Sequence, residues 1–267
     1  MSALYNNHSI GIFDSGVGGL SIAKSVTELL PTESFIYLAD SLNAPYGNLS
    51  PEQIKDRVNA IAQWFISQNV KALVIACNTA TVNAIDQLRA LIDIPIIGVE
   101  PAIKPAVEQS RTHKIAIMVT QATAINERFI KLVTTNKQNA EVFIQACPGL
   151  VEIVETDNIE SVRCQELLRQ YLAPLINTDI DTLVLGCTHY PFLTDKIRLI
   201  LGDQIKLVET SNPVAKQLER QLISHGLMAK NDHIAQSLFF STQANEQQDK
   251  IFSHLWKNKI ELKNITI

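Results

Sequence analysis

The sequence predicts an α/β fold made of two similar units, each a doubly wound parallel sheet with helices on both faces. Three observations carry this prediction. Short apolar runs alternate with longer stretches whose apolar residues recur at helical spacing. The same alternation restarts near Lys114. Two of the apolar runs end in nearly matching motifs, ALVIACNTA at 72–80 and LVLGCTHYP at 183–191.

The first unit contains four apolar runs that predict buried strands, at residues 10–13, 35–39, 73–76 and 96–99. Amphipathic stretches between these runs predict helices at residues 20–30, 51–69 and 81–92. Pro51 suits a first helical turn, and Ser50 suits the N-cap position before it. This regular alternation favours parallel strands joined by helices.

The second unit repeats the pattern, with strands predicted at residues 115–119, 142–145, 183–185 and 205–208. Its helices are predicted at residues 124–133, 159–175 and 191–201. The tail adds a helix at 213–224, a strand at 237–240 and a helix near 248–256. From the symmetry of the pattern we expect a first domain of 1–97 plus 209–267 and a second domain of 98–208.

The composition excludes several classes of protein. With 267 residues, 46% of them hydrophobic and 19% charged, the chain can build one large or two ordinary domains and is not disordered. A net charge of −4 without a polybasic stretch argues against nucleic-acid binding. Residues 1–9 do not resemble a signal peptide, and no apolar segment reaches the roughly 18 residues of a membrane helix. We therefore expect a cytoplasmic protein with no membrane partner.

Two loops follow predicted strands and carry polar groups. In IFDSGVGG, residues 12–19, Asp14 ends a strand and three glycines permit a tight turn into a helix, whose free N–H groups suit an anion. The alternative is a plain turn in which Asp14 or Ser15 caps the helix. In ADSLNAPYG, residues 39–47, Asp40 ends the next strand, and Tyr46 and Gly47 lie in a rigid turn that offers a phenol and N–H groups. The alternative is an ordinary loop.

The cysteines are the most informative side chains. Cys147 and Cys164 are expected to be inert buried residues. Cys77 and Cys187 stand at predicted strand ends, where a helix N-terminus would favour the thiolate. His189 could exchange a proton with Cys187, although a purely structural imidazole remains the alternative.

Four kinds of chemistry could use two such thiols. A stable disulfide is disfavoured in a reducing compartment. A zinc site lacks the usual spacing and a fourth ligand, so no metal is expected. A cysteine–histidine hydrolase would leave one cysteine idle. A two-base reaction uses both, because one thiolate removes a proton from a carbon while the thiol on the opposite face returns one. Inverting a stereocentre requires this arrangement.

The chain resembles the glutamate racemases of the cofactor-independent amino-acid racemase superfamily. The resemblance rests on FDSGVGG (13–19), APYG (44–47), IACNTA (75–80), ACPGLVEIVE (146–155) and LGCTHYP (185–191). It implies interconversion of L- and D-glutamate, supply of D-glutamate for peptidoglycan, no cofactor, and two flavodoxin-like domains facing each other across a cleft. Family members form dimers, so a homodimer is an expectation. Aspartate racemisation is the nearest alternative.

The resemblance also implies roles for individual residues. Cys77 and Cys187 match the two acid/base residues, acting on D-glutamate and L-glutamate respectively. Four further residues match supporting acidic or basic positions, namely Asp14, His189, Asp40 and Glu155. The residues that match substrate-binding positions are Asp14, Ser15, Tyr46, Gly47, Asn78, Thr79, Thr120, Thr123, Thr188 and His189. The chain departs from the usual family residues at Val119, Asn126, Phe129 and Glu209.

Overall fold

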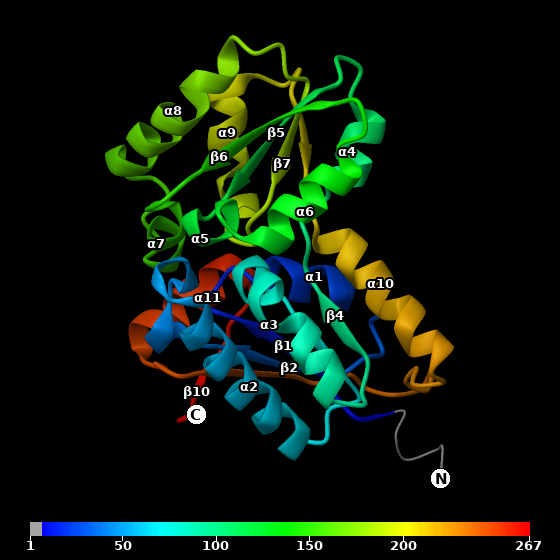
Figure 1. The fold of residues 1–267 in the computed structure, drawn as a ribbon. Helices are drawn as coiled ribbons and strands as arrows, with labels where there is room; N and C mark the ends of the chain where they lie inside the picture. The colour runs from blue at the N-terminus through cyan, green and yellow to red at the C-terminus, as the bar shows by residue number, and fades with distance from the viewer. Residues whose placement is uncertain (1–6) are drawn as a thin grey trace.

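The computed structural model describes residues 7–267 as two stacked α/β units, drawn one above the other in Figure 1. Residues 1–6 lie outside the described range, so the expectation about a signal peptide falls largely outside it. Sheet A has the strand order β10-β9-β2-β1-β3-β4 and sheet B the order β6-β5-β7-β8. All the pairings between neighbouring strands are parallel. Two parallel sheets with helices around them confirm the predicted fold class.

Sheet A takes strands from both ends of the described chain. Its strands are β1 (Ile10–Asp14), β2 (Phe35–Ala39), β3 (Ala72–Ile75), β4 (Ile96–Gly98), β9 (Ser237–Ser241) and β10 (Lys263–Asn264). Its accompanying helices are α1 (Leu20–Leu29), α2 (Pro51–Ser67), α3 (Asn78–Leu91), α10 (Ser211–Ser224) and α11 (Glu246–Trp256). Every residue of β1, β2 and β3 is buried, which explains their unbroken apolar sequences. The tail strand β9 lies beside β2, with Phe35 opposite Ser237.

Sheet B is smaller. Its strands are β5 (Lys114–Val119), β6 (Glu141–Ala146), β7 (Thr182–Leu185) and β8 (Lys206–Val208). Its helices are α4 (Ile103–Gln109), α5 (Gln121–Ala124), α6 (Glu127–Asn136), α7 (Leu150–Glu155), α8 (Val162–Ile176) and α9 (Thr194–Leu201). Three short 3-10 helices, Ser41–Asn43, Tyr46–Asn48 and Tyr190–Leu193, occupy loops that follow strands.

Local capping explains where α2 and α6 begin. Ser50 accepts a hydrogen bond from the Gln53 N–H and Pro51 occupies the first turn, which confirms the predicted start of α2. The single helix predicted at 124–133 is instead α5 followed by α6. The break comes from Asn126, whose side chain accepts hydrogen bonds from the Arg128 and Phe129 N–H groups.

The chain passes between the two sheets after β4 and again after β8. Both crossing segments lie side by side, because Gly98, Pro101 and Thr210 line the same cavity of about 380 Å³. Beyond the second crossing, α10 packs against α1 of the lower unit (Figure 1). The carboxyl ends of both sheets meet in the region between the units, where parallel sheets bind ligands.

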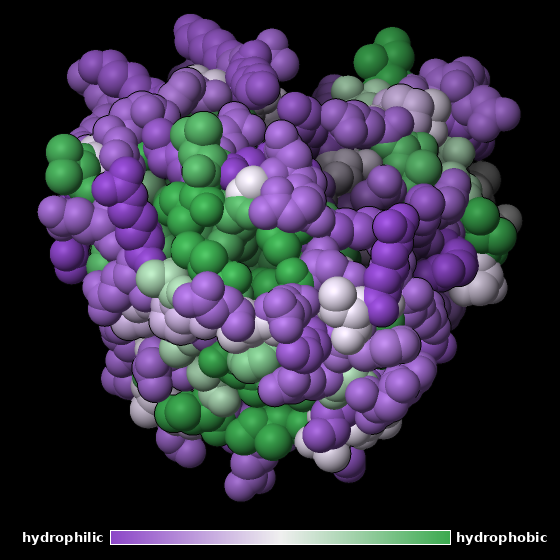
Figure 2. All heavy atoms as spheres, turned by 90° about the horizontal axis from the view of Figure 1, so that it is seen from above, coloured by the Kyte–Doolittle hydropathy of each residue, from purple (hydrophilic) through white to green (hydrophobic). Residues whose placement is uncertain are grey.

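The surface is mostly hydrophilic on the face seen in Figure 2, with apolar residues gathered in a few patches. In the unit built on sheet B, the exposed apolar side chains include Ile176 at the end of α8 and Leu199 on α9. Within the described range, none of the helices combines the length and apolar character that a membrane span requires.

Candidate active site

The cysteines of the two matching motifs lie at equivalent places in the two sheets. Cys77 follows β3 after one alanine, Ala76, and Cys187 follows β7 after one glycine, Gly186. Each is only 6% exposed. Cys187 lies close enough to Cys77 for its charge to raise the pKa of Cys77. Thr188, the residue after Cys187, donates a hydrogen bond to Asp14, whose neighbour Ser15 lies 3.4 Å from the Cys77 sulfur, so the two cysteine motifs meet at the loop after β1. Cys147 and Cys164 are also buried, as expected.

Cys77 is the N-cap of α3. Its Sγ accepts a hydrogen bond from the Ala80 N–H at 3.5 Å and lies 3.4 Å from the hydroxyl of Ser15. Burial and the charge of Asp14 raise the pKa of the Cys77 thiol to about 12, although the hydrogen bonds with Ser15 and Ala80 lower it. The Ala80 N–H at the start of α3 favours the thiolate, as expected, but the loss of hydration on burial outweighs it and the pKa rises.

Cys187 has a basic neighbour. Its Sγ lies 3.7 Å from Nδ1 of His189, whose Nε2 contacts Oε1 of Glu155 at 2.5 Å. Burial lowers the pKa of His189, but hydrogen bonds and charge from Cys187 and Glu155 outweigh it, so this pKa lies well above its ordinary value. These neighbours favour the protonated ring of His189, which lies between a sulfur and a carboxylate.

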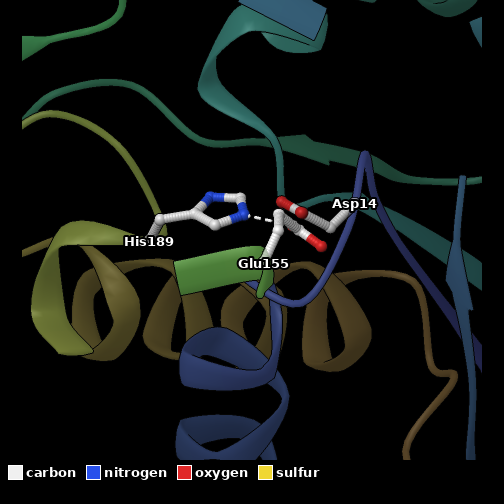
Figure 3. Close-up of side chains that lie close together, drawn as sticks. All are labelled: Asp14, Glu155 and His189. Atoms are coloured by element: carbon white, nitrogen blue, oxygen red, sulfur yellow. Dashed lines mark hydrogen bonds and ion pairs between the residues drawn. The ribbon is translucent and has the colours of Figure 1, made fainter. Parts of the chain in front are cut away.

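Asp14 joins the two units through hydrogen bonds. One carboxylate oxygen accepts the Gly16 N–H at 2.8 Å, and the other accepts the hydroxyl of Thr188, which follows Cys187, at 3.0 Å. Burial raises the pKa of Asp14, and the charge of His189 partly counteracts that rise. Figure 3 shows Asp14 and Glu155 close to the ring of His189.

The same three side chains form a group of metal-ligating type. Within the described residues, one ligand atom from each of Asp14, Glu155 and His189 lies within 4.8 Å of the others. These atoms already have protein partners, because Glu155 Oε1 accepts the Val17 N–H at 2.8 Å as well as contacting His189. The arrangement therefore serves as an internal hydrogen-bond network that links the glycine loop to α7.

Two glycines allow this network to form. A Cβ at Gly16 would stand 1.7 Å from Oε1 of Glu155, and one at Gly18 would stand 2.3 Å from Nδ1 of His189. Neither position has room for a side chain, so the loop approaches sheet B with bare backbone. Beneath the loop, the buried hydroxyl of Tyr37 donates a hydrogen bond to the Gly16 carbonyl at 2.7 Å.

A cluster of three hydroxyls also crosses between the units. Thr79 in the first turn of α3 lies 3.0 Å from Thr120 and 3.4 Å from Thr123, measured between hydroxyl oxygens. Next to it, Asn78 donates to the Val99 carbonyl at 3.3 Å, while its Oδ1 is buried and has no hydrogen-bond partner. A buried orphan acceptor is costly, so this oxygen marks a place where a donor on a ligand would bind.

Asp40 and Tyr46 lie in a network of their own. The Tyr46 hydroxyl donates to Asp40 at 2.6 Å, and Arg57 on α2 donates to both carboxylate oxygens, at 3.0 and 2.7 Å. Burial raises the pKa of Asp40, but hydrogen bonds from Arg57 and Tyr46 more than offset it, so the pKa is lowered. The structure therefore does not bring the Asp40 carboxylate together with the Cys187, His189 and Glu155 network.

Gly47 lines two cavities near this region. It lines a cavity of about 680 Å³ together with Lys55, Asn83 and Arg128, and a smaller one of about 30 Å³ together with Thr120. A Cβ at Gly47 would meet Thr120 at an ordinary 3.6 Å. The two cavities share Gly47, and the smaller one borders Thr120 of the hydroxyl cluster.

The sequence motifs did not indicate two arginines that form polar contacts around the site, Arg57 and Arg128. Arg57 lies on α2 outside every motif. Arg128 on α6 contacts Asp86 of α3 and donates to Glu100 at 2.8 Å, so it joins the two units at the mouth of the larger cavity. Asn126, where the chain departs from the usual family residue, also joins α3, because its side-chain amide donates to Asn83 at 3.2 Å. Only the packed structure places these residues together.

Comparison with known proteins finds similar sequences and similar structures. The model of the Asp/Glu/Hydantoin racemase family matches residues 17–217. A glutamate racemase from Ralstonia pickettii is 46% identical over 233 residues, covering 87% of this chain and 82% of that protein. A glutamate racemase isoform from Bacillus anthracis has a similar structure, with a TM-score of 0.90, 30% identity and 98% of each chain covered. So does one from Francisella tularensis in complex with D-glutamate, with a TM-score of 0.86, 28% identity and 98% of each chain covered.

Proposed function

Because the chain belongs to the Asp/Glu/Hydantoin racemase family and is an amino-acid racemase of the glutamate racemase group, we propose that Cys77 and Cys187 are its two acid/base residues. One thiolate removes the α-proton of glutamate, and the thiol on the opposite face returns a proton. The observation that carries the proposal is the pairing of two buried cysteines at equivalent strand ends of facing sheets. The D-glutamate formed would supply peptidoglycan synthesis in the cytoplasm.

The resting protonation states suit reaction from the L-enantiomer. With its pKa raised to about 12, Cys77 is a neutral thiol at neutral pH and can act as the acid. Beside Cys187, the charged ring of His189 at 3.7 Å stabilises negative charge on the sulfur. Cys187 would then take the α-proton of L-glutamate, and Cys77 would give its proton to the other face of the carbon.

The reverse reaction exchanges the two roles. A Cys77 thiolate is strongly basic, because burial and the nearby Asp14 charge both disfavour the anion. It would remove the α-proton of D-glutamate, while Cys187 returns a proton that His189 can replenish. Glu155 holds the ring of His189 in place at 2.5 Å, which keeps this route available during each turnover.

Substrate recognition would use the polar groups between the sheets. The orphan Oδ1 of Asn78 and the carboxylate of Asp14 can accept hydrogen bonds from the ammonium group. The hydroxyls of Thr79 and Thr188 can donate to the α-carboxylate once they leave their present partners. An α-hydrogen is a very weak acid, and one well-aimed donor to the developing negative charge can contribute about 3–4 kcal/mol.

Single-cysteine variants test the proposal. We expect Cys77→Ala and Cys187→Ala each to abolish racemisation of glutamate in deuterated water, whereas Cys164→Ala, a buried cysteine away from this network, retains it. Appreciable turnover by either of the first two variants would contradict the two-base reaction. Chiral chromatography of L-glutamate and of L-aspartate, incubated separately without added cofactor, defines the substrate.

Serine variants assign each thiol to one face. With a 3-halogenated glutamate, removal of the α-proton and loss of halide require only one base. We expect Cys187→Ser to retain this elimination for the D-configured analogue, and Cys77→Ser to retain it for the L-configured analogue. Equal retention of both configurations by one variant would rule out the assignment.

A further inference from the structure

We propose that Arg57 is a positioning residue for this racemase, acting through Asp40 and Tyr46 to hold the loop that carries Gly47. The inference rests on the proposed function for its catalytic consequence. The contacts that support this inference lie on α2, on the loop after β2 and on the C-terminal segment. Neither Cys77 nor Cys187 takes part in them.

The Asp40 carboxylate accepts five hydrogen bonds. Oδ1 accepts from Asn43 at 3.0 Å, from Arg57 Nη2 at 2.7 Å and from Thr242 at 3.1 Å. Oδ2 accepts from Tyr46 at 2.6 Å and from Arg57 Nε at 3.0 Å. Since a carboxylate offers about four lone-pair sites, no lone pair remains for a substrate proton. Asp40 is therefore a hub that stays ionised, and its effect on the reaction passes through its donors.

Among the described residues that donate to Asp40, Arg57 is the one that carries a positive charge, and a further contact fixes its position. Its Nε and Nη2 form a two-pronged contact with Asp40, while its Nη1 donates to the Ile267 carbonyl at 2.6 Å. Planar two-pronged pairs of this kind set direction as well as distance. The guanidinium thus ties α2, the end of β2 and the C-terminal segment together.

Tyr46 connects the Arg57–Asp40 pair to the loop that carries Gly47. Its ring is 1% exposed and packs near Phe13 of β1, with ring centroids 6.1 Å apart. Its hydroxyl donates to Asp40 at 2.6 Å, and its ring belongs to the same buried cluster as Cys77. Gly47 follows directly and faces Thr120 across the gap. Without Arg57, the buried charge of Asp40 loses its counter-ion and the Tyr46 hydroxyl loses a fixed acceptor.

The decisive experiment combines kinetics with amide hydrogen exchange. We expect Arg57→Gln to lower kcat/KM for glutamate by about 10- to 100-fold, the usual range for a residue that orients others. In a Tyr46→Phe background the same substitution should change kcat/KM by less than about threefold, because the transmitting hydroxyl is absent. An equal loss in both backgrounds would overturn the proposal.

Exchange in residues 42–49 gives a readout independent of activity. We expect it to become faster in Arg57→Gln and to stay unchanged in Arg89→Gln, a matched control whose guanidinium donates twice to the Ile96 carbonyl in the same unit. Unchanged exchange in Arg57→Gln, or an equal loss of kcat/KM in the control, would overturn the positioning role. If the native enzyme does not racemise glutamate, the proposed function fails, and the exchange result still decides whether Arg57 holds the loop.

Discussion

Replacing Gly16 with alanine tests whether Glu155 must hold His189 for catalysis. The new Cβ would stand 1.7 Å from Oε1 of Glu155, whereas ordinary contacts begin at 3.4 Å, so the carboxylate must retreat by about 1.7 Å (3.4 − 1.7). That movement breaks its contacts with the ring of His189 at 2.5 Å and with the Val17 N–H at 2.8 Å. Hydrogen bonds to charged groups contribute about 1.5–3 kcal/mol each.

We expect Gly16→Ala to lower kcat/KM by about 100-fold, because a displacement of roughly 1 Å at a catalytic group commonly costs that much. The loss must be equal from L- and D-glutamate, since the two enantiomers have the same free energy in water. Circular dichroism follows racemisation in each direction. The pKa of His189 should fall, because the Glu155 contact and charge that raise it are lost, and nuclear magnetic resonance of the ring reports this.

Gly226→Ala is the control. No heavy atom lies within 4 Å of its added Cβ, and its φ of +66° should cost only about 1 kcal/mol of folding free energy. We expect it to retain native kcat/KM. If Gly16→Ala also kept native kcat/KM while a crystal structure showed Glu155 displaced, the contact between Glu155 and His189 would be unnecessary for catalysis.

Three further predictions concern ionisation and stability. Alkylation of Cys77 should accelerate about tenfold per pH unit up to pH 10 without a plateau, measured by mass spectrometry, because its pKa is raised to about 12; a plateau near pH 8 would contradict this. Burial raises the pKa of Asp181, but hydrogen bonds lower it to about 2. The ionised Asp181 therefore stabilises the folded state fully above the unfolded pKa of about 3.9, and this stabilisation is lost as pH falls toward 2. Asp181→Asn should therefore lower Tm by a few degrees at pH 7, with the gap to the native protein narrowing between about pH 4 and pH 2; a constant gap would refute the reasoning. Lys71→Met should cost about 3–5 kcal/mol in urea unfolding, because it leaves the buried Glu33 partner, 2.5 Å away, without its cation; a loss below about 1 kcal/mol would show that Glu33 does not depend on this pair.

The strands were predictable because burial on both faces leaves an unmistakable record in the sequence. The runs at 10–13 and 35–39 became β1 and β2, in which every residue is buried. Helix starts were harder to predict. The helix expected at 81–92 begins at Asn78, because Cys77 itself supplies the N-cap and small polar residues after a strand show no helical period. That difference of three residues places the sulfur at a helix start.

The contacts around the site depended on packing that no local pattern records. The glycine loop and both cysteine motifs identified the residues that meet between the sheets. The partners that fix them did not stand out, since Arg57 is 17 positions beyond Asp40 on an amphipathic helix. Likewise, the capping side chain of Asn126 turned one expected helix into two. Long-range polar pairs follow from how elements assemble, which a periodicity does not encode.

The hydroxyls and carboxylates between the sheets bond to each other across the gap, as Thr79 does with Thr120 and Thr188 with Asp14. When an amino acid binds, each of these hydrogen bonds is replaced by one to the ligand, so binding gains little enthalpy. Modest affinity is an advantage for a catalyst whose two mirror-image products are equally stable. A site that bound either enantiomer tightly would release its product slowly. Here the side chains can re-form their hydrogen bonds with each other when an enantiomer leaves, which favours release of both.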